Sequence, residues 1–100
     1  MSNQTIVNGS FFFDPDDPIY QSHFPSFPVV PGSLLVGRFL QTIKEMKDNP
    51  EMLVIKTFTF KGFTTPGICN YSIEMTDTQI KCQLFQANSL KAKGVITYAS

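Results

Sequence analysis

Cysteine is scarce in this sequence of 100 residues, which contains two, Cys69 and Cys82. Two cysteines are too few for a disulfide scaffold, and these two lack the paired spacing of a zinc site. We expect both to be small, buried and reduced side chains within strands. The carboxylates of the turn at 14–18 suggest a cation site as one alternative, but aspartates that cap their own backbone explain them more simply. We therefore expect no metal and no cofactor.

Charge of one sign and long apolar runs are also missing. Eight basic and eight acidic residues cancel, and no run of like charge exceeds a residue or two outside 14–17. This balance excludes a surface patch of like charge that would bind a nucleic acid or a membrane surface. No apolar run approaches the roughly 18 to 20 residues of a membrane span, and residues 1–4 lack the pattern of a signal peptide. We therefore expect a cytoplasmic protein.

The chain is long enough for one domain, residues 1–100, with a single core. A first strand is expected at 5–13 and a helix at 33–47. Four later segments alternate with the period of strands, with turns at 75–78 and 86–89; these segments are 52–61, 67–75, 78–87 and 89–99. We expect these four to form an antiparallel meander. The fold class is then α+β, with an antiparallel sheet of about five strands wrapped around one long buried helix.

The expected helix carries a broad apolar arc that should be largely buried. A second stripe contains Gly37 and Gln41, which are four residues apart and therefore lie on the same side. Gly37 is unusual, because a glycine inside a helix costs about 1 kcal/mol relative to alanine. Either another group packs closely against it, or a side chain that the site once used is absent.

The sole histidine precedes a proline-rich segment that ends where the helix starts. Pro25, Pro28 and Pro31 recur at every third residue, and each fixes φ and removes a backbone donor. Residues 24–31 should therefore form a stiff, irregular strap that holds His23 at a fixed separation from the helix N-terminus. This layout suits catalysis or recognition of an acyl group. A histidine that only hydrogen-bonds the backbone fits the pattern as well.

The run His-Phe-Pro-x-x-Pro-x-x-Pro-Gly at residues 23–32 resembles the active-site signature of the hot-dog-fold (3R)-hydroxyacyl-[acyl carrier protein] dehydratases of fatty-acid and polyketide synthesis. Gln41 in the helix and the segment 60–67, with its Pro-Gly turn, are also similar to that family. The resemblance covers roughly residues 6–99. It implies a hot-dog fold and a pairing of two protomers.

The resemblance also implies roles for particular residues. His23 occupies the position of the base that removes the α-proton of a 3-hydroxyacyl thioester, and Gly32 that of the backbone N–H that polarises the thioester carbonyl. The first amides of a helix have no acceptor within it. These amides and the helix dipole can stabilise the negative charge that develops on the thioester carbonyl. The family's acid, a Glu or Asp fourteen residues beyond the histidine, is replaced by Gly37, so the chain alone should be a poor dehydratase. The residues expected to bind the substrate are Phe24, Pro31, Ser33, Gly37 and Gln41.

Pairing in the family brings the base of one protomer to the acid of the other. A heterodimer with an acid-bearing homologue would therefore complete one site around His23, whereas a homodimer would lack the acid in both. The implied substrate is an acyl thioester on acyl carrier protein or coenzyme A. The alternatives are a non-catalytic subunit that binds an acyl thioester or stabilises a partner, and an acyl thioesterase, for which no carboxylate is well placed.

Overall fold

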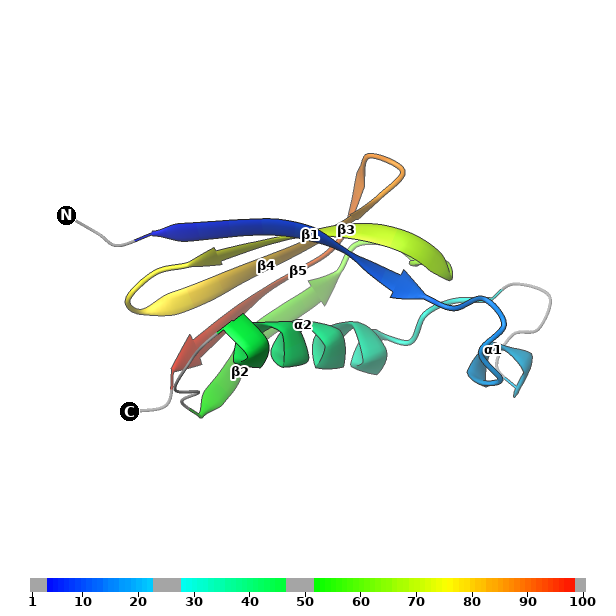
Figure 1. The fold of residues 1–100 in the computed structure, drawn as a ribbon, viewed down its shortest axis with the longest axis horizontal. Coiled ribbons are helices and arrows are strands. Elements are labelled where there is room, and N and C mark those ends of the chain that lie inside the picture. Colours follow the sequence, from blue (N-terminus) through cyan, green and yellow to red (C-terminus); the bar gives the residue numbers. More distant parts are fainter. Residues whose placement is uncertain (1–3, 23–27, 47–51, 99–100) are drawn as a thin grey trace.

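The computed structural model describes residues 4–22, 28–46 and 52–98. Its elements, drawn in Figure 1, are β1 (Thr5–Phe13), α1 (Ile19–Ser22), α2 (Gly32–Met46), β2 (Leu53–Phe60), β3 (Gly67–Met75), β4 (Gln79–Gln86) and β5 (Ser89–Tyr98). Every predicted strand and the long helix are confirmed, with ends that agree to within one residue. The short helix α1 was not expected.

All five strands form one antiparallel sheet in the order β1-β3-β4-β5-β2. The predicted meander of four strands is wrong for its first strand. Only β3, β4 and β5 are neighbours in chain order, whereas β2 pairs with β5 at the far edge of the sheet. The connection 61–66 accounts for this order. Lys61 N donates to Lys91 O of β5 at 2.8 Å, and Thr65 N donates to the Gln86 side chain of β4 at 3.0 Å. The chain therefore crosses the ends of β5 and β4 before it enters β3.

The pairing of β2 with β5 places a glycine opposite an aromatic ring. Phe58 and Gly94 are register partners, and Gly94 is buried. A Cβ atom at position 94 would overlap the Phe58 ring, so glycine leaves the room that this ring occupies. The ring faces α2, and its centroid lies 5.8 Å from that of Phe39. The fit of the Phe58 ring over Gly94 cannot be predicted from the alternation within either strand. The partner of β2 was therefore predicted wrongly.

The turn between β4 and β5 is confirmed. Gln86 and Ser89 are the last register partners of the hairpin. Ala87 and Asn88 between them have positive φ values of 53° and 62°, as in the two-residue turns whose twist matches that of the flanking strands.

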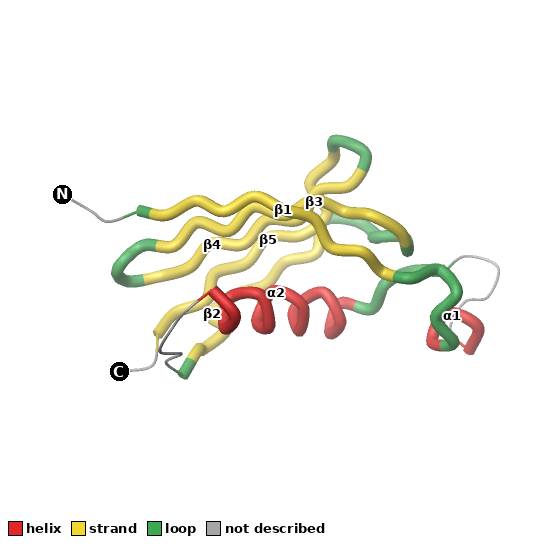
Figure 2. The backbone as a smooth tube through the Cα atoms, in the orientation of Figure 1, coloured by secondary structure: helices red, strands yellow, loops and turns green. Residues whose placement is uncertain are grey.

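Helix α2 lies along one face of the sheet and is buried on one side only (Figures 1 and 2). Its buried residues are Leu35, Phe39 and Ile43, which recur at every fourth position. Gly37 and Gln41 are exposed. The expected long buried helix is therefore buried along one face alone, because the sheet of this chain covers a single side.

Aromatic rings fill the space between α2 and the sheet. The Phe39 ring meets Phe11 edge-on, with centroids 5.1 Å apart, and Tyr71 stacks on Phe11 at 4.4 Å. The Arg38 guanidinium lies over the rings of Phe11 and Phe13, at 5.3 and 5.5 Å from their centroids. These contacts hold β1 against α2 and fix which side of the helix faces the sheet.

The aspartates of the turn at 14–18 cap their own backbone, as expected. Asp14 Oδ1 accepts a hydrogen bond from Asp16 N at 2.9 Å. Asp17 Oδ1 accepts one from Ile19 N at 3.0 Å, at the first residue of α1. These bonds account for the carboxylates of Asp14 and Asp17 without a cation.

Both cysteines are buried and free, as predicted. Burial raises the pKa of the Cys69 thiol to about 11 and that of Cys82 to about 12. The two side chains therefore stay protonated and behave as small core residues. Within the described part of the chain, no helix has both the length and the apolar character needed to cross a membrane.

Candidate active site

The first turn of α2 presents backbone donors. The carbonyl of Pro31 accepts hydrogen bonds from Leu34 N at 3.0 Å and from Leu35 N at 3.3 Å. The amides of Gly32 and Ser33 precede these two, so the helix itself offers them no acceptor. Gly32 is half-buried and Ser33 is exposed. Both amides lie at the positive end of the helix dipole, where negative charge is stabilised.

The end of the strap is fixed against the β2–β3 connection. Residues 28–31 form neither helix nor strand, as predicted. Val30 is buried, and its N–H donates to the carbonyl of Thr64 at 2.8 Å. This bond holds the helix N-terminus beside the connection. His23 and Phe24, toward the other end of the strap, lie outside the described residues.

A cavity of about 330 Å³ opens between the helix N-terminus and the β2–β3 connection. Its lining is mostly apolar and consists of Val29, Val30, Pro31, Gly32, Leu35, Phe60, Gly62, Phe63 and Thr64. A Cβ atom at Gly32 would lie 2.8 Å from Cζ of Phe60, so glycine lets this ring approach the backbone. The described lining includes no carboxylate. The cavity therefore offers an apolar wall beside backbone donors.

Thr64 is the polar exception in this wall. The residue is 1% exposed, and its hydroxyl oxygen is buried and has no hydrogen-bond partner in the described structure. The sequence singled out the segment 60–67 as a family motif but not Thr64 as a site residue. Polar residues of a connection are normally exposed, so its place within that motif was the only sequence signal.

The outer side of α2 carries a second, more open hollow of about 480 Å³. Its lining residues come from one face of the helix: Gly37, Leu40, Gln41, Lys44 and Glu45. Gln41 Nε2 donates to Glu45 Oε1 at 3.4 Å. A Cβ atom at Gly37 would meet nothing within 4 Å in the described structure beyond its own stretch of helix. Close packing within the described part of this chain is therefore not the reason for glycine at this position.

The structure thus separates four of the predicted site residues into two places, and Ser33 lines neither of them. Pro31 and Gly32 line the cavity at the helix N-terminus, and Gly37 and Gln41 line the outer hollow. Gly37 follows Leu35 by two residues, which is about 200° around the helix. Because Leu35 lines the cavity, a side chain at position 37 would be directed away from it.

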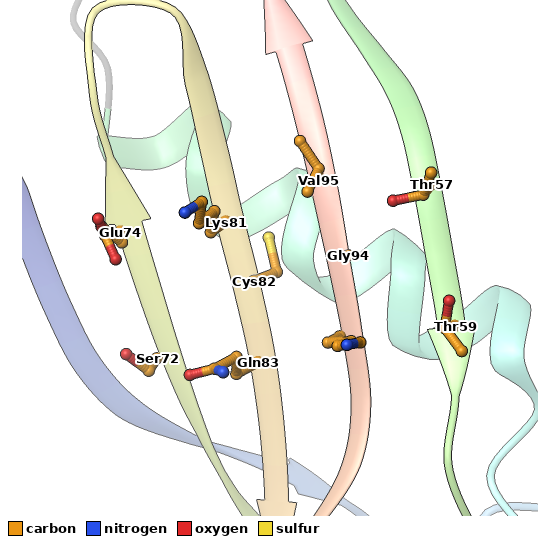
Figure 3. A pocket seen from close by; sticks show the side chains of 10 residues that line it. Thr57, Thr59, Ser72, Glu74, Lys81, Cys82, Gln83, Gly94 and Val95 are labelled. Atoms are coloured by element: carbon orange, nitrogen blue, oxygen red, sulfur yellow. The ribbon is translucent and has the colours of Figure 1, made fainter.

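A third hollow lies on the face of the sheet that is turned away from α2 (Figure 3). It measures about 440 Å³ and is lined mainly by polar residues of β2, β3, β4 and β5. Glu74 and Lys81 are cross-strand neighbours there. None of the described candidate residues lines it, and we assign this solvent-facing side of the sheet no part in the site.

Comparison with known proteins decides the family. The model of the FabA-like domain matches residues 3–98. The chain belongs to the FabA-like domain family. Among its relatives, the 3-hydroxyacyl-[acyl-carrier-protein] dehydratase FabZ of Thermotoga neapolitana is 36% identical over an alignment of 56 positions, which covers 51% of this chain and 41% of that protein. FabZ of Lawsonia intracellularis is 29% identical over an alignment of 103 positions, which covers 84% of this chain and 66% of that protein.

The match thus spans less than half the length of the Thermotoga relative. Solved structures of other proteins share the fold. "The Dehydratase Heterocomplex ApeI:P from Xenorhabdus doucetiae" aligns with a TM-score of 0.79 at 14% identity, over 100% of this chain and 97% of that one. An uncharacterized protein from Erwinia carotovora subsp. atroseptica aligns with a TM-score of 0.69 at 15% identity, over 96% and 84%. The resemblance to hot-dog-fold dehydratases is confirmed at the level of family and fold.

Proposed function

We propose that the chain is a 3-hydroxyacyl-[acyl carrier protein] dehydratase-like protein of fatty-acid or polyketide biosynthesis. The main support is the N-terminus of α2, where Gly32 lines an apolar cavity of about 330 Å³. Small-molecule sites occupy roughly 300 to 1,000 Å³, so this volume suits a short acyl group. The names of the FabZ relatives motivate the substrate, an acyl thioester on acyl carrier protein or coenzyme A.

In the proposed reaction, the thioester carbonyl accepts a hydrogen bond from the Gly32 N–H, and His23 removes the α-proton. Negative charge then develops on the carbonyl oxygen, where the N–H and the helix dipole stabilise it. The carbonyl re-forms as the double bond forms between the α and β carbons and the 3-hydroxyl group leaves. The leaving hydroxyl needs a proton, and this proton requires an acid.

Position 37 cannot provide that acid, because Gly37 has no side chain. Loss of a general acid typically lowers a rate 10²- to 10⁴-fold, or about 3 to 5 kcal/mol. Gln41 is no replacement, since an amide donates a hydrogen bond but not a proton at neutral pH. The chain by itself is therefore expected to turn over 3-hydroxyacyl thioesters slowly.

We propose that an acid-bearing homologue pairs with this chain and completes the site. Gly37 lies on the outer side of α2, so a carboxylate on the equivalent face of a homologue is available to a neighbouring protomer. The structural relative described as a dehydratase heterocomplex provides a precedent for such pairing in this fold. In the heterodimer, the homologue's acid serves the cavity of this chain, while the homologue's own base faces Gly37.

A non-catalytic role, in binding an acyl thioester or stabilising a partner, is the second candidate. It is favoured by the lack of a carboxylate among the described residues of the cavity. The binding form of this role predicts that the chain binds the thioester but forms no enoyl product with any partner.

The test measures enoyl product from a 3-hydroxyacyl carrier-protein thioester. The chain is assayed alone, with an acid-bearing homologue, and as Gly37→Glu, which supplies the acid. A double variant, His23→Ala with Gly37→Glu, supplies the acid without the base. If the acid acts across a pair, mixing the double variant with the wild-type chain yields activity that neither has alone. Lys44→Glu adds a carboxylate elsewhere in the same hollow, and this matched control should remain inactive.

The outcomes separate the two roles. Wild-type turnover as fast as that of Gly37→Glu contradicts the need for an external acid. Thioester binding without activity in any combination favours the non-catalytic role. Failure to bind the thioester contradicts the dehydratase-like role and the binding role, and it favours stabilisation of a partner.

A further inference from the structure

Phe60 is an aromatic residue of the cavity whose ring lies against the N-terminus of α2. It is the last residue of β2, and its register partner Ala92 is buried. Directly opposed residues share a face of the sheet, so the Phe60 side chain is directed toward α2. Its outer ring carbons lie 2.8 to 3.2 Å from the place that a Cβ atom at Gly32 would take. Phe60 is nonetheless 47% exposed and lines the cavity, so a ligand there can contact it.

The next ring along the same face of β2 is that of Phe58. The centroids of the Phe58 and Phe60 rings are 5.6 Å apart, and the Phe58 ring packs toward Phe39 of α2. Of the two β2 rings, only that of Phe60 belongs to the described lining of the cavity. Phe60 therefore closes the cavity on the side of Phe58, where the apolar layer between α2 and the sheet begins.

We infer that Phe60 is a specificity-determining residue that limits the length of the acyl group bound in this cavity. The inference rests on the proposed function, which places the thioester carbonyl at the Gly32 N–H. An acyl chain that starts at Gly32 meets the Phe60 ring beside it and cannot extend past that ring toward Phe58. The site therefore selects short 3-hydroxyacyl groups, and the outer methylenes of longer ones stay in water.

The energetics of methylene burial give the expected pattern. Each methylene that leaves water strengthens binding about 4-fold, so a step of two carbons inside the cavity is worth about 15-fold. A methylene that stays in water adds little. A plot of affinity against acyl length should therefore rise and then level off at the length that fills the cavity.

The experiment measures this plot by isothermal titration calorimetry with the full chain. The ligands are pantetheine amides of 3-hydroxybutanoyl, 3-hydroxyhexanoyl, 3-hydroxyoctanoyl and 3-hydroxydecanoyl groups, because an amide keeps the carbonyl and resists elimination. We expect the affinity of the wild-type chain to level off within this series. Phe60→Ala opens the way toward Phe58, and its affinity should rise by about 15-fold for one further step of two carbons.

Two further variants support the comparison. Phe12→Ala makes the same change at a phenylalanine of β1 that is 56% exposed and does not line the cavity, and it should level off at the wild-type length. If Phe60→Ala does not fold, Phe60→Leu makes the test, because leucine lacks the outer ring carbons that approach Gly32. Its affinity should level off at a longer acyl group than that of the wild-type chain.

An affinity that rises through the whole series in the wild-type chain overturns the inference. So does a Phe60→Ala or Phe60→Leu chain that is folded and levels off at the wild-type length. In both cases, binding of the shorter ligands leaves the proposed function standing. If the wild-type chain binds none of the four ligands, the proposed function and the inference fall together.

Discussion

Replacing Gly37 with alanine should stabilise the folded chain. The residue lies inside α2 and is exposed. A Cβ at this position meets nothing within 4 Å in the described structure beyond its own stretch of helix, so the added methyl group brings no steric cost. Alanine also loses less conformational freedom than glycine when the helix forms. The expected gain is therefore the full difference in helix propensity, about 0.8 to 1.0 kcal/mol.

A gain of this size is measurable in the thermal unfolding of a small domain. For about 60 to 100 residues, 1 kcal/mol shifts Tm by roughly 4 to 8 °C. Circular dichroism at 222 nm can follow the transition of the wild-type and Gly37→Ala chains at one protein concentration, since Tm depends on concentration if the chains associate.

An unchanged or lower Tm would refute this reasoning, because it would show that another group packs against Gly37. Repeating the measurement over a range of concentrations identifies the source of that contact. A loss of stability that grows with concentration means that a second copy of the chain covers the outer side of α2. A loss that is independent of concentration means that the contact is within one chain.

Three further predictions test the fold. Gly94→Ala should destabilise the chain by about 1 to 3 kcal/mol in urea unfolding, because the new Cβ displaces the Phe58 ring. Arg38→Ala should cost about 0.5 to 1 kcal/mol through loss of the cation–π contact with Phe11, and Arg38→Lys should retain part of it. The Cys82 thiol, whose pKa is raised to about 12, should not react with a disulfide reagent at neutral pH until urea unfolds the chain. Its unfolded form ionises near the ordinary pKa of 9.0, so stability should fall as pH rises from about 9 toward 12.

Local pattern predicted where the strands and the long helix lie, because alternation and helical periodicity report which faces are apolar. The turn at 86–89 was also predictable, since Asn88 tolerates a positive φ. The order of strands was not. The place of β2 depends on Phe58 fitting over Gly94 and on Lys61 bonding to Lys91, and these partners lie far apart in the sequence.

The candidate site was predictable where a motif fixes backbone geometry. Pro31 and Gly32 were expected at the helix N-terminus, and the structure has them there. Thr64 was not identified, because nothing local indicates that a threonine in a connection is buried. Its burial arises from a tertiary contact, the hydrogen bond with Val30, and from the cavity walls that the two segments form together.

The two hollows on α2 explain how the loss at position 37 affects the proposed assembly. Leu35 and Gly37 face in nearly opposite directions, so the helix that provides the backbone donor of one cavity would present its carboxylate outward. In the proposed pair, an acid at position 37 would therefore serve the neighbouring cavity, and glycine at this position leaves the partner's site without one. Under the same proposal, the cavity of this chain would take its proton from the partner. The proposal thus gives one intact site per heterodimer, at the cavity of the protomer that lacks the acid.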